Sequence, residues 1–155
     1  MQENPILVLD TADGFNKLKI EYLHGDIAEK ELNGENSYHI FHVRMLTEYL
    51  LRELCAHNSD IALSEEEIAA ISTASSAHDI GKLKVPKSIL DHPGTLSPVE
   101  YDIVKKHAIL GEQIIREADP GDVSAEIINF AAEIAKFHHE RVDGTGYPEG
   151  VRGDS

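Results

Sequence analysis

The chain has 155 residues, 41% of them hydrophobic, and a formal net charge of −14 at pH 7. Its length and apolar content fit one domain with a hydrophobic core. The acidic balance excludes general binding to DNA or RNA, because such a surface repels phosphate backbones. No apolar run approaches the roughly 20 residues that span a bilayer. Because the single cysteine, Cys55, cannot form an internal disulfide and no signal peptide is recognisable, we expect a cytoplasmic domain.

Residues 1–36 differ from the rest of the chain in their pattern. We interpret them as a linker or as the tail of a preceding domain, such as a regulatory domain of a parent protein. The run PILVLD predicts a short strand, and FNKLKIEYLHGDIAEKEL predicts a helix that is interrupted at Gly25. The run NGEN, at residues 33–36, predicts a turn before the main domain.

From Ser37 onward, apolar residues recur at three- and four-residue spacing, which predicts an all-α domain, a bundle of about five helices. The first predicted helix covers residues 37–57. His42 lies on the same face of this helix as Leu46 and Tyr49. We expect that face to be buried.

Serine residues mark the starts of two later helices. Ser64 and Glu67 have the spacing of a capping box, as do Ser97 and Glu100, and Pro98 suits the first position of a helix. The predicted helices then cover about residues 64–77, 86–90, 97–118 with a bend, and 123–139.

The pair His78–Asp79, in the run SSAHDIGKLKVP, combines two kinds of metal ligand. A carboxylate can bridge two metal ions while the neighbouring imidazole binds one of them. Lys82 follows closely enough to face an anion held by those ions. Taken alone, the same residues also fit the end of a helix with a surface histidine and a solvated lysine.

Four more histidines, His42, His107, His138 and His139, lie on predicted helices or at their ends. Each one alone also fits a structural role, as a hydrogen-bonded core residue or as a cation near the negative end of a helix. Taken together they favour metal binding, because helical bundles build dinuclear sites from inward-facing ligands on several helices. The histidines left outside this set are His24, His39, His57 and His92.

Three runs of the sequence resemble a known family. HDIGKLKVPKSIL, HPGTLSPVEYDIVKKHAILGEQII and HHERVDGTGYPEG are similar, in order and spacing, to the motifs of the HD-GYP family. This family is a branch of the HD superfamily of metal-dependent phosphohydrolases. The resemblance extends from about His42 to Asp154. It implies an all-α bundle that hydrolyses the bacterial second messenger cyclic di-GMP.

The resemblance also implies roles for single residues. Asp79 is expected to bridge two divalent metal ions, most often iron or manganese, so that a bridging hydroxide attacks phosphorus. Asp79 and Lys82 are the implied catalytic residues, and Lys82 is expected to contact the substrate phosphate. The remaining implied metal ligands are His42, His78, His107, His138 and His139, and the substrate-binding GYP signature is Gly146, Tyr147 and Pro148.

The sequence departs from the family pattern in two places. Members with three metal ions carry a glutamate one turn before the first histidine, where this chain has Tyr38, so we expect two ions. His39 is the residue that could substitute for that glutamate. The family also places an aspartate ligand in a helix after the GYP loop. We therefore interpret residues 37–155 as an HD-GYP domain that is incomplete at its C-terminal end.

Three functions stay open on the sequence alone. The first is a cyclic di-GMP phosphodiesterase. The second is a catalytically inactive signalling module that binds the nucleotide or a partner protein, and the third is a phosphodiesterase for another cyclic dinucleotide. A homodimer is a further expectation from the resemblance.

Overall fold

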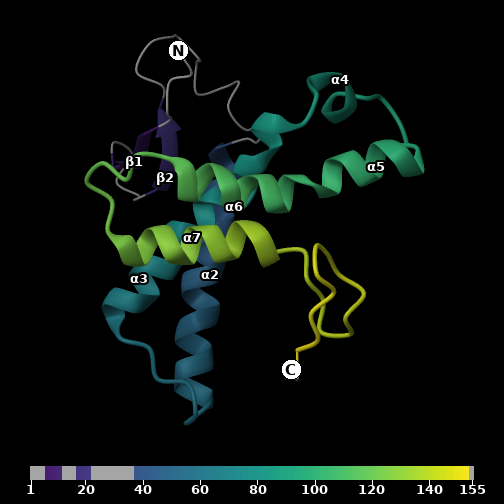
Figure 1. Ribbon diagram of the computed structural model, residues 1–155. Coiled ribbons are helices and arrows are strands. Elements are labelled where there is room, and N and C mark those ends of the chain that lie inside the picture. Colours follow the sequence, from purple (N-terminus) through teal and green to yellow (C-terminus); the bar gives the residue numbers. More distant parts are fainter. Residues whose placement is uncertain (1–5, 12–16, 22–36, 154–155) are drawn as a thin grey trace.

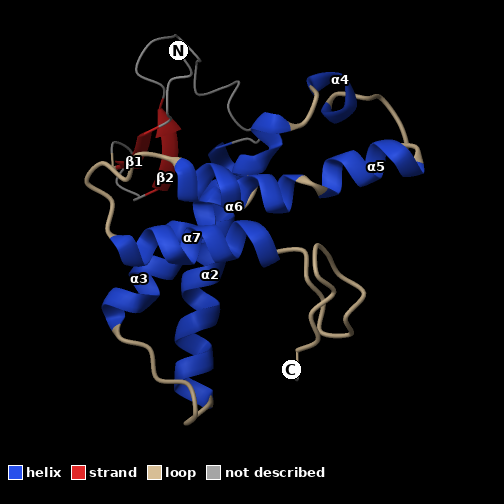
Figure 2. Ribbon diagram, viewed as in Figure 1, coloured by secondary structure: helices blue, strands red, loops and turns tan. Residues whose placement is uncertain are grey.

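The computed structural model describes residues 6–11, 17–21 and 37–153 of the chain (Figure 1). Helices dominate these residues, as Figure 2 shows, so the predicted all-α architecture is confirmed. None of these helices is both long and apolar enough to cross a membrane. The α-helices are α2 (Ser37–His57), α3 (Glu65–Ala74), α4 (Lys87–Leu90), α5 (Pro98–Lys105), α6 (His107–Glu117) and α7 (Ala125–Phe137), and the 3₁₀ helices are η1 (Ser75–Ala77) and η2 (Ile80–Lys84).

Local sequence signals account for the helix boundaries. Both predicted capping boxes form, with the Ser64 hydroxyl accepting from the backbone of Glu67 and the Ser97 hydroxyl accepting from the backbone of Glu100. The predicted bend in the segment after Ser97 is also confirmed, because α5 ends at Lys105 and α6 begins two residues later. The helix predicted to run through residue 77 changes to the tighter η1 after Ala74.

The core lies where α3, η1, α6 and α7 meet, and α6 and α7 run side by side across it (Figure 1). Many of its buried residues are alanines, which let helix backbones approach closely. Ile114 and Ile115 of α6 supply larger apolar side chains to the same core. The buried alanines of this cluster are Ala74, Ala77, Ala118, Ala131, Ala132 and Ala135.

An antiparallel pair of strands, β1 (Ile6–Asp10) and β2 (Lys17–Glu21), packs against the helices. The predicted strand PILVLD is confirmed, whereas the helix predicted over residues 17–21 is wrong. The run KLKIE alternates polar and apolar residues, and β1 supplies a partner strand, so the extended conformation forms instead. The rest of that predicted helix and the NGEN turn lie outside the described residues.

The strand pair is joined to the helical core by buried contacts. Leu7 and Leu18 are buried members of the core cluster. The backbone N–H of Leu18 donates a 2.8 Å hydrogen bond to the hydroxyl of Ser76 in η1, and that of Leu7 donates to the carbonyl of Asp119. The boundary that we predicted at residue 36 stays a prediction, but the strands before it contribute to the same core.

The apolar face of α2 is exposed, contrary to our prediction that it is buried. Leu46 and Tyr49 are each 59% exposed, and Met45, Leu50 and Leu54 are also exposed. Among the described residues, α2 packs on α3 and η1, and this contact involves a different side of the helix. The apolar spacing predicts a helix face that is suited to burial, but it does not show which other element, if any, packs on that face.

Two glycines let η2 and α6 pack at close range, next to the His78–Asp79 pair. A Cβ atom at Gly81 would overlap the carbonyl oxygen of His107 and would lie 2.5 Å from the amide nitrogen of Gly111. At Gly111 itself a Cβ atom would lie 3.1 Å from the Cβ of Ala135. The absence of a side chain at Gly81 therefore sets the distance between the η2 segment and α6.

We predict that Gly81→Ala lowers the free energy of unfolding by about 3 kcal/mol, because the backbone of α6 must move away from η2. Gly111→Ala is the matched control, since its contact is milder and alanine favours the helix by about 1 kcal/mol. Urea denaturation of the metal-free chain measures both effects. Equal stabilities for the two variants would contradict the close packing described for Gly81.

Candidate metal centre

The His78–Asp79 pair lies between two 3₁₀ helices because serine hydroxyls compete with regular helix hydrogen bonding. The hydroxyl of Ser75 donates to the carbonyl of Ser72, and that of Ser76 donates to the carbonyl of Thr73. The chain tightens into η1, passes His78 and Asp79, and tightens again into η2. This path buries Asp79, whose residue surface is 8% exposed.

The other predicted ligands of the core lie at helix ends. His107 is the first residue of α6, at the bend after α5, and is 1% exposed. His138 and His139 follow the last residue of α7. Because α6 and α7 lie side by side, these helix ends bring three imidazoles toward Asp79.

Asp79, His107, His138 and His139 form the group that we call the inner group. One ligand atom from each lies within 4.8 Å of all the others. The Oδ1 atom of Asp79 is 3.1 Å from Nε2 of His107 and 3.7 Å from Nε2 of His138. Ligand atoms that share one ion at about 2 Å lie within roughly this span, so the group suits a single metal ion.

Backbone carbonyls determine which nitrogen of three histidines is available. Nδ1 of His78 is 3.0 Å from the carbonyl oxygen of Ser75, and Nδ1 of His107 is 2.7 Å from that of Val104. Nδ1 of His138 is likewise 3.0 Å from the carbonyl oxygen of Ala135. A carbonyl only accepts, so each Nδ1 carries a proton, which leaves Nε2 as the ring nitrogen that can bind a ligand.

Two of these Nε2 atoms, those of His107 and His138, belong to the inner group. Nε2 of His107 and Nε2 of His138 are 3.2 Å apart, and both are near the carboxylate of Asp79. A metal ion among these three atoms would bind all of them at once. Histidines held at Nδ1 by a carbonyl are also the usual form of metal ligands. The donor set therefore fits a divalent metal ion.

A second group, which we call the outer group, consists of His39, His78 and Asp79, again with ligand atoms within 4.8 Å of one another. Nε2 of His78 is 3.1 Å from Oδ2 of Asp79, whereas His107 and His138 lie near the other oxygen, Oδ1. The ring centroids of His39 and His78 are 5.6 Å apart. The two oxygens of Asp79 thus serve different groups, as a bridging carboxylate requires.

His42, the residue that the resemblance assigns as the ligand of the first helix, belongs to neither group. It is exposed on α2, where its ring lies beside that of Phe41. His39, one helical turn earlier, belongs to the outer group, where we expected His42. Sequence reasoning placed His39 outside the main set, although its three-residue spacing from His42 was a signal that both share one side of the helix.

Lys82 lies beside the inner and outer groups, as predicted from its place in the sequence. Its Nζ is 2.7 Å from Oδ2 of Asp79, and its side chain is 25% exposed. The ammonium thus adds positive charge at the edge of the cluster in a chain whose net charge is −14. An incoming anion can reach it from solvent.

The GYP residues Gly146, Tyr147 and Pro148 lie in the loop that follows α7. The Tyr147 ring stacks on the His139 ring, with centroids 4.5 Å apart and an angle of 23° between the planes. Burial raises the pKa of the Tyr147 phenol to about 12, so its hydroxyl stays protonated. A Cβ atom at Gly146 would lie 2.5 Å from the carbonyl oxygen of His139, so only glycine fits there.

Burial, together with the neighbouring rings of His138 and His107, lowers the pKa of the His139 imidazole to about 4. The ring is therefore neutral at physiological pH. A neutral imidazole is the form that binds metal ions.

Comparison with known proteins gives one family and a set of curated relatives. A profile described as HD domain matches residues 27–155. A cyclic di-GMP phosphodiesterase of Thermotoga maritima is 36% identical over 121 residues, which is 71% of this chain and 32% of the relative. In Vibrio cholerae, a 3'3'-cGAMP-specific phosphodiesterase 3 is 38% identical over 75% of this chain and 22% of the relative. A probable cyclic di-GMP phosphodiesterase of Vibrio cholerae is 42% identical over 59% of this chain and 21% of the relative.

The chain therefore spans about a third or less of the length of these relatives.

We predict that His39→Ala reduces the metal content of the chain, whereas His42→Ala leaves it unchanged. His39 belongs to the outer group, and His42 is an exposed residue of the same helix and hence a matched control. Loss of a direct ligand should weaken the binding of one metal ion by at least about 10 to 100-fold, the loss of affinity that is typical when an outer-shell partner is removed. Elemental analysis and titration with Mn²⁺ measure the effect. Metal loss in His42→Ala alone would return the ligand role to His42.

We also predict that the metal-free chain becomes less stable as pH falls from about 6.5 to about 4. His139 takes up a proton near pH 6.5 when unfolded but only near pH 4 when folded, so acid favours the unfolded chain. Urea midpoints at pH 7 and pH 5 measure the loss. His139→Asn should show a smaller loss than the wild-type chain, and identical losses would contradict the prediction.

Proposed function

This chain belongs to the HD domain family, in the HD-GYP branch, and on that premise we propose that it is a metal-dependent phosphodiesterase of cyclic dinucleotides. The substrate that we favour is cyclic di-GMP. One observation carries the proposal: Asp79 presents one oxygen to the inner group and the other to the outer group. This is the geometry of a carboxylate shared by two ions.

When bound, two divalent ions, with iron or manganese as the favoured identities, supply a water of lowered pKa and polarised phosphate oxygens. His107, His138 and His139 would hold the ion of the inner group, and His39 with His78 would hold the ion of the outer group. Asp79 would be common to both. The carbonyl partners of the three Nδ1 atoms fix the tautomer and the orientation of these imidazoles before any ion arrives.

Lys82 would bind the phosphate of the substrate. Its ammonium already lies 2.7 Å from Oδ2 of Asp79, so a phosphate oxygen near the two groups comes within its reach. A fixed cation stabilises the negative charge that accumulates on phosphate oxygens in the transition state. It also offsets the repulsion between an acidic chain and an anionic substrate.

A second candidate substrate is a cyclic dinucleotide with mixed bases. Several relatives are named 3'3'-cGAMP-specific phosphodiesterases, at 35% to 40% identity. Both substrates carry the same pair of phosphodiester groups, so the metal centre suits either one. Contacts to the bases would decide between them.

We predict that Asp79→Asn abolishes metal binding and lowers turnover by more than about 100-fold. Even the mutation of an outer-shell partner lowers metal affinity or activity by about 10 to 100-fold. Asp60→Asn is the matched control, because Asp60 is exposed and outside both groups. Elemental analysis and chromatography of products from cyclic di-GMP and 3'3'-cGAMP measure these effects under anaerobic conditions. Retained turnover in Asp79→Asn would contradict the proposed chemistry. A wild-type chain that binds metal and hydrolyses neither compound would instead support the non-enzymatic signalling module.

A further inference from the structure

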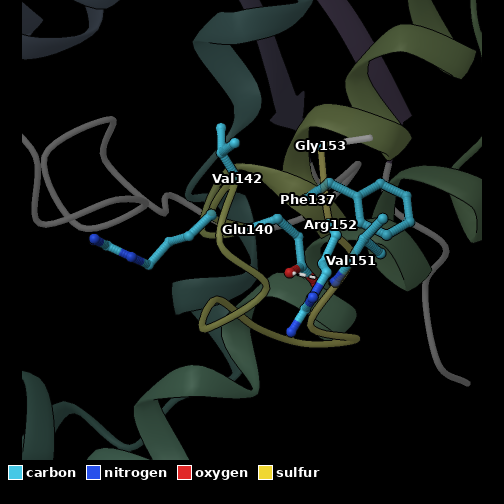
Figure 3. A pocket seen from close by; sticks show the side chains of 7 residues that line it. Phe137, Glu140, Val142, Val151, Arg152 and Gly153 are labelled. Carbon is cyan, nitrogen blue, oxygen red and sulfur yellow. Dashed lines mark hydrogen bonds between the residues drawn. The ribbon is translucent and has the colours of Figure 1, made fainter. Parts of the chain in front are cut away.

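The loop after α7 folds back on Glu140, the residue that follows His138 and His139. The carboxylate of Glu140 accepts hydrogen bonds from three consecutive backbone N–H groups, those of Glu149 at 2.7 Å, Gly150 at 3.0 Å and Val151 at 3.0 Å. Figure 3 shows Glu140 directed toward the segment that holds Val151 and Arg152. Glu140, Val151 and Arg152 are among the residues that line an open, mostly apolar hollow of about 360 Å³.

This arrangement is a small anion site made of backbone. Successive N–H groups that converge on one point form a concave donor set, which favours a negative charge at its centre. Gly150 makes the convergence possible, because its φ of +66° lies in the left-handed region that favours glycine. The Glu140 side chain is thereby the anion that closes the loop upon itself.

Closure of the loop brings Tyr147 onto His139. The backbone N–H of Tyr147 donates to the carbonyl of His139, and the two rings stack. Gly146 passes so close to the backbone of residues 139–141 that no side chain fits. The course of residues 140–151 thus determines where the Tyr147 ring lies.

His139 depends on that ring more than the other histidines do. His78, His107 and His138 each have Nδ1 held by a backbone carbonyl. Among the residues that the structure describes, no hydrogen bond holds the ring of His139; instead it packs against neighbouring rings, with Tyr147 stacked on its face. Its orientation toward the inner group therefore rests on packing.

We propose that Glu140 is a positioning residue for His139: by holding the backbone of residues 149–151 it keeps Tyr147 stacked on the His139 ring and so orients that imidazole for metal binding. The inference rests on the proposed metal centre. It assigns Glu140 an indirect role, although a carboxylate directly after two histidines resembles a third ligand. Glu140 is in neither the inner nor the outer group, and both of its oxygens accept from the loop.

The test compares the wild-type chain with Glu140→Ala, Glu140→Gln, Tyr147→Ala and the control Glu133→Ala, an exposed carboxylate on α7. Hydrogen exchange followed by NMR reports the amides of residues 149–151. Titration with Mn²⁺ reports the number of ions and their dissociation constants. Neither measurement requires turnover, so a failure of the proposed hydrolysis leaves both measurements interpretable.

We expect Glu140→Ala to lose protection at these three amides and to raise the Mn²⁺ dissociation constant of the inner group about 10-fold, with the number of ions unchanged. Glu140→Gln should lie between the wild type and Glu140→Ala in both measurements, because its remaining carbonyl oxygen still accepts from the loop. Tyr147→Ala should reproduce the weaker Mn²⁺ binding while the three amides stay protected, and Glu133→Ala should match the wild type.

Three results would overturn the inference. Loss of an ion in Glu140→Ala would make Glu140 a direct ligand. Lost amide protection with unchanged Mn²⁺ affinity would show that the loop closure does not orient His139. Unprotected amides in the wild-type chain would show that the Glu140 hydrogen bonds are not formed.

Discussion

The carboxylate of Asp79 is the point around which the candidate site is organised. Its Oδ1 lies 3.1 Å from an imidazole nitrogen of His107, and its Oδ2 lies 3.1 Å from His78 and 2.7 Å from Lys82. A buried carboxylate is costly unless positive charge surrounds it. Histidines that donate from Nδ1 to backbone carbonyls offer Nε2 to a ligand, so bound metal ions together with the ammonium of Lys82 would supply that charge.

Two kinds of contact, hydrogen bonds and ring packing, orient the imidazoles around that carboxylate. Backbone carbonyls at helix ends hold His78, His107 and His138, which ties their orientation to the secondary structure itself. His139 is held by ring packing, and the ring that faces it belongs to a loop closed by Glu140. A ligand held by a loop is easier to perturb than one held by a helix. The GYP loop would therefore contribute to the candidate metal centre by positioning one of its ligands.

Close backbone packing brings the separate helices together at this point. Without a side chain at Gly81, η2 lies against α6 and places Asp79 beside His107. The strand pair β1–β2 contacts the same region from another side, because Leu18 donates to Ser76, two residues before His78. The segment that carries the His78–Asp79 pair is thus supported both by α6 and by the strand pair β1–β2.

The sequence by itself determined the helices and most of the candidate ligands. Capping boxes at Ser64 and Ser97 are local interactions within a few residues, so they form as predicted. The adjacent pairs His78–Asp79 and His138–His139 were recognisable as ligand types side by side, and the resemblance to the HD-GYP family added His107 to them.

Only the tertiary structure decided which histidine of α2 approaches the site. Residues three apart share one side of a helix, so spacing cannot separate His39 from His42. The rotation of α2 about its own axis, set by its packing on α3 and η1, turns His39 toward His78 and leaves His42 and the stripe of Leu46 and Tyr49 exposed. The strand β2 was likewise missed: the alternation in KLKIE is only five residues long, and its pairing with β1 is a contact that the structure shows and the pattern of one short run does not.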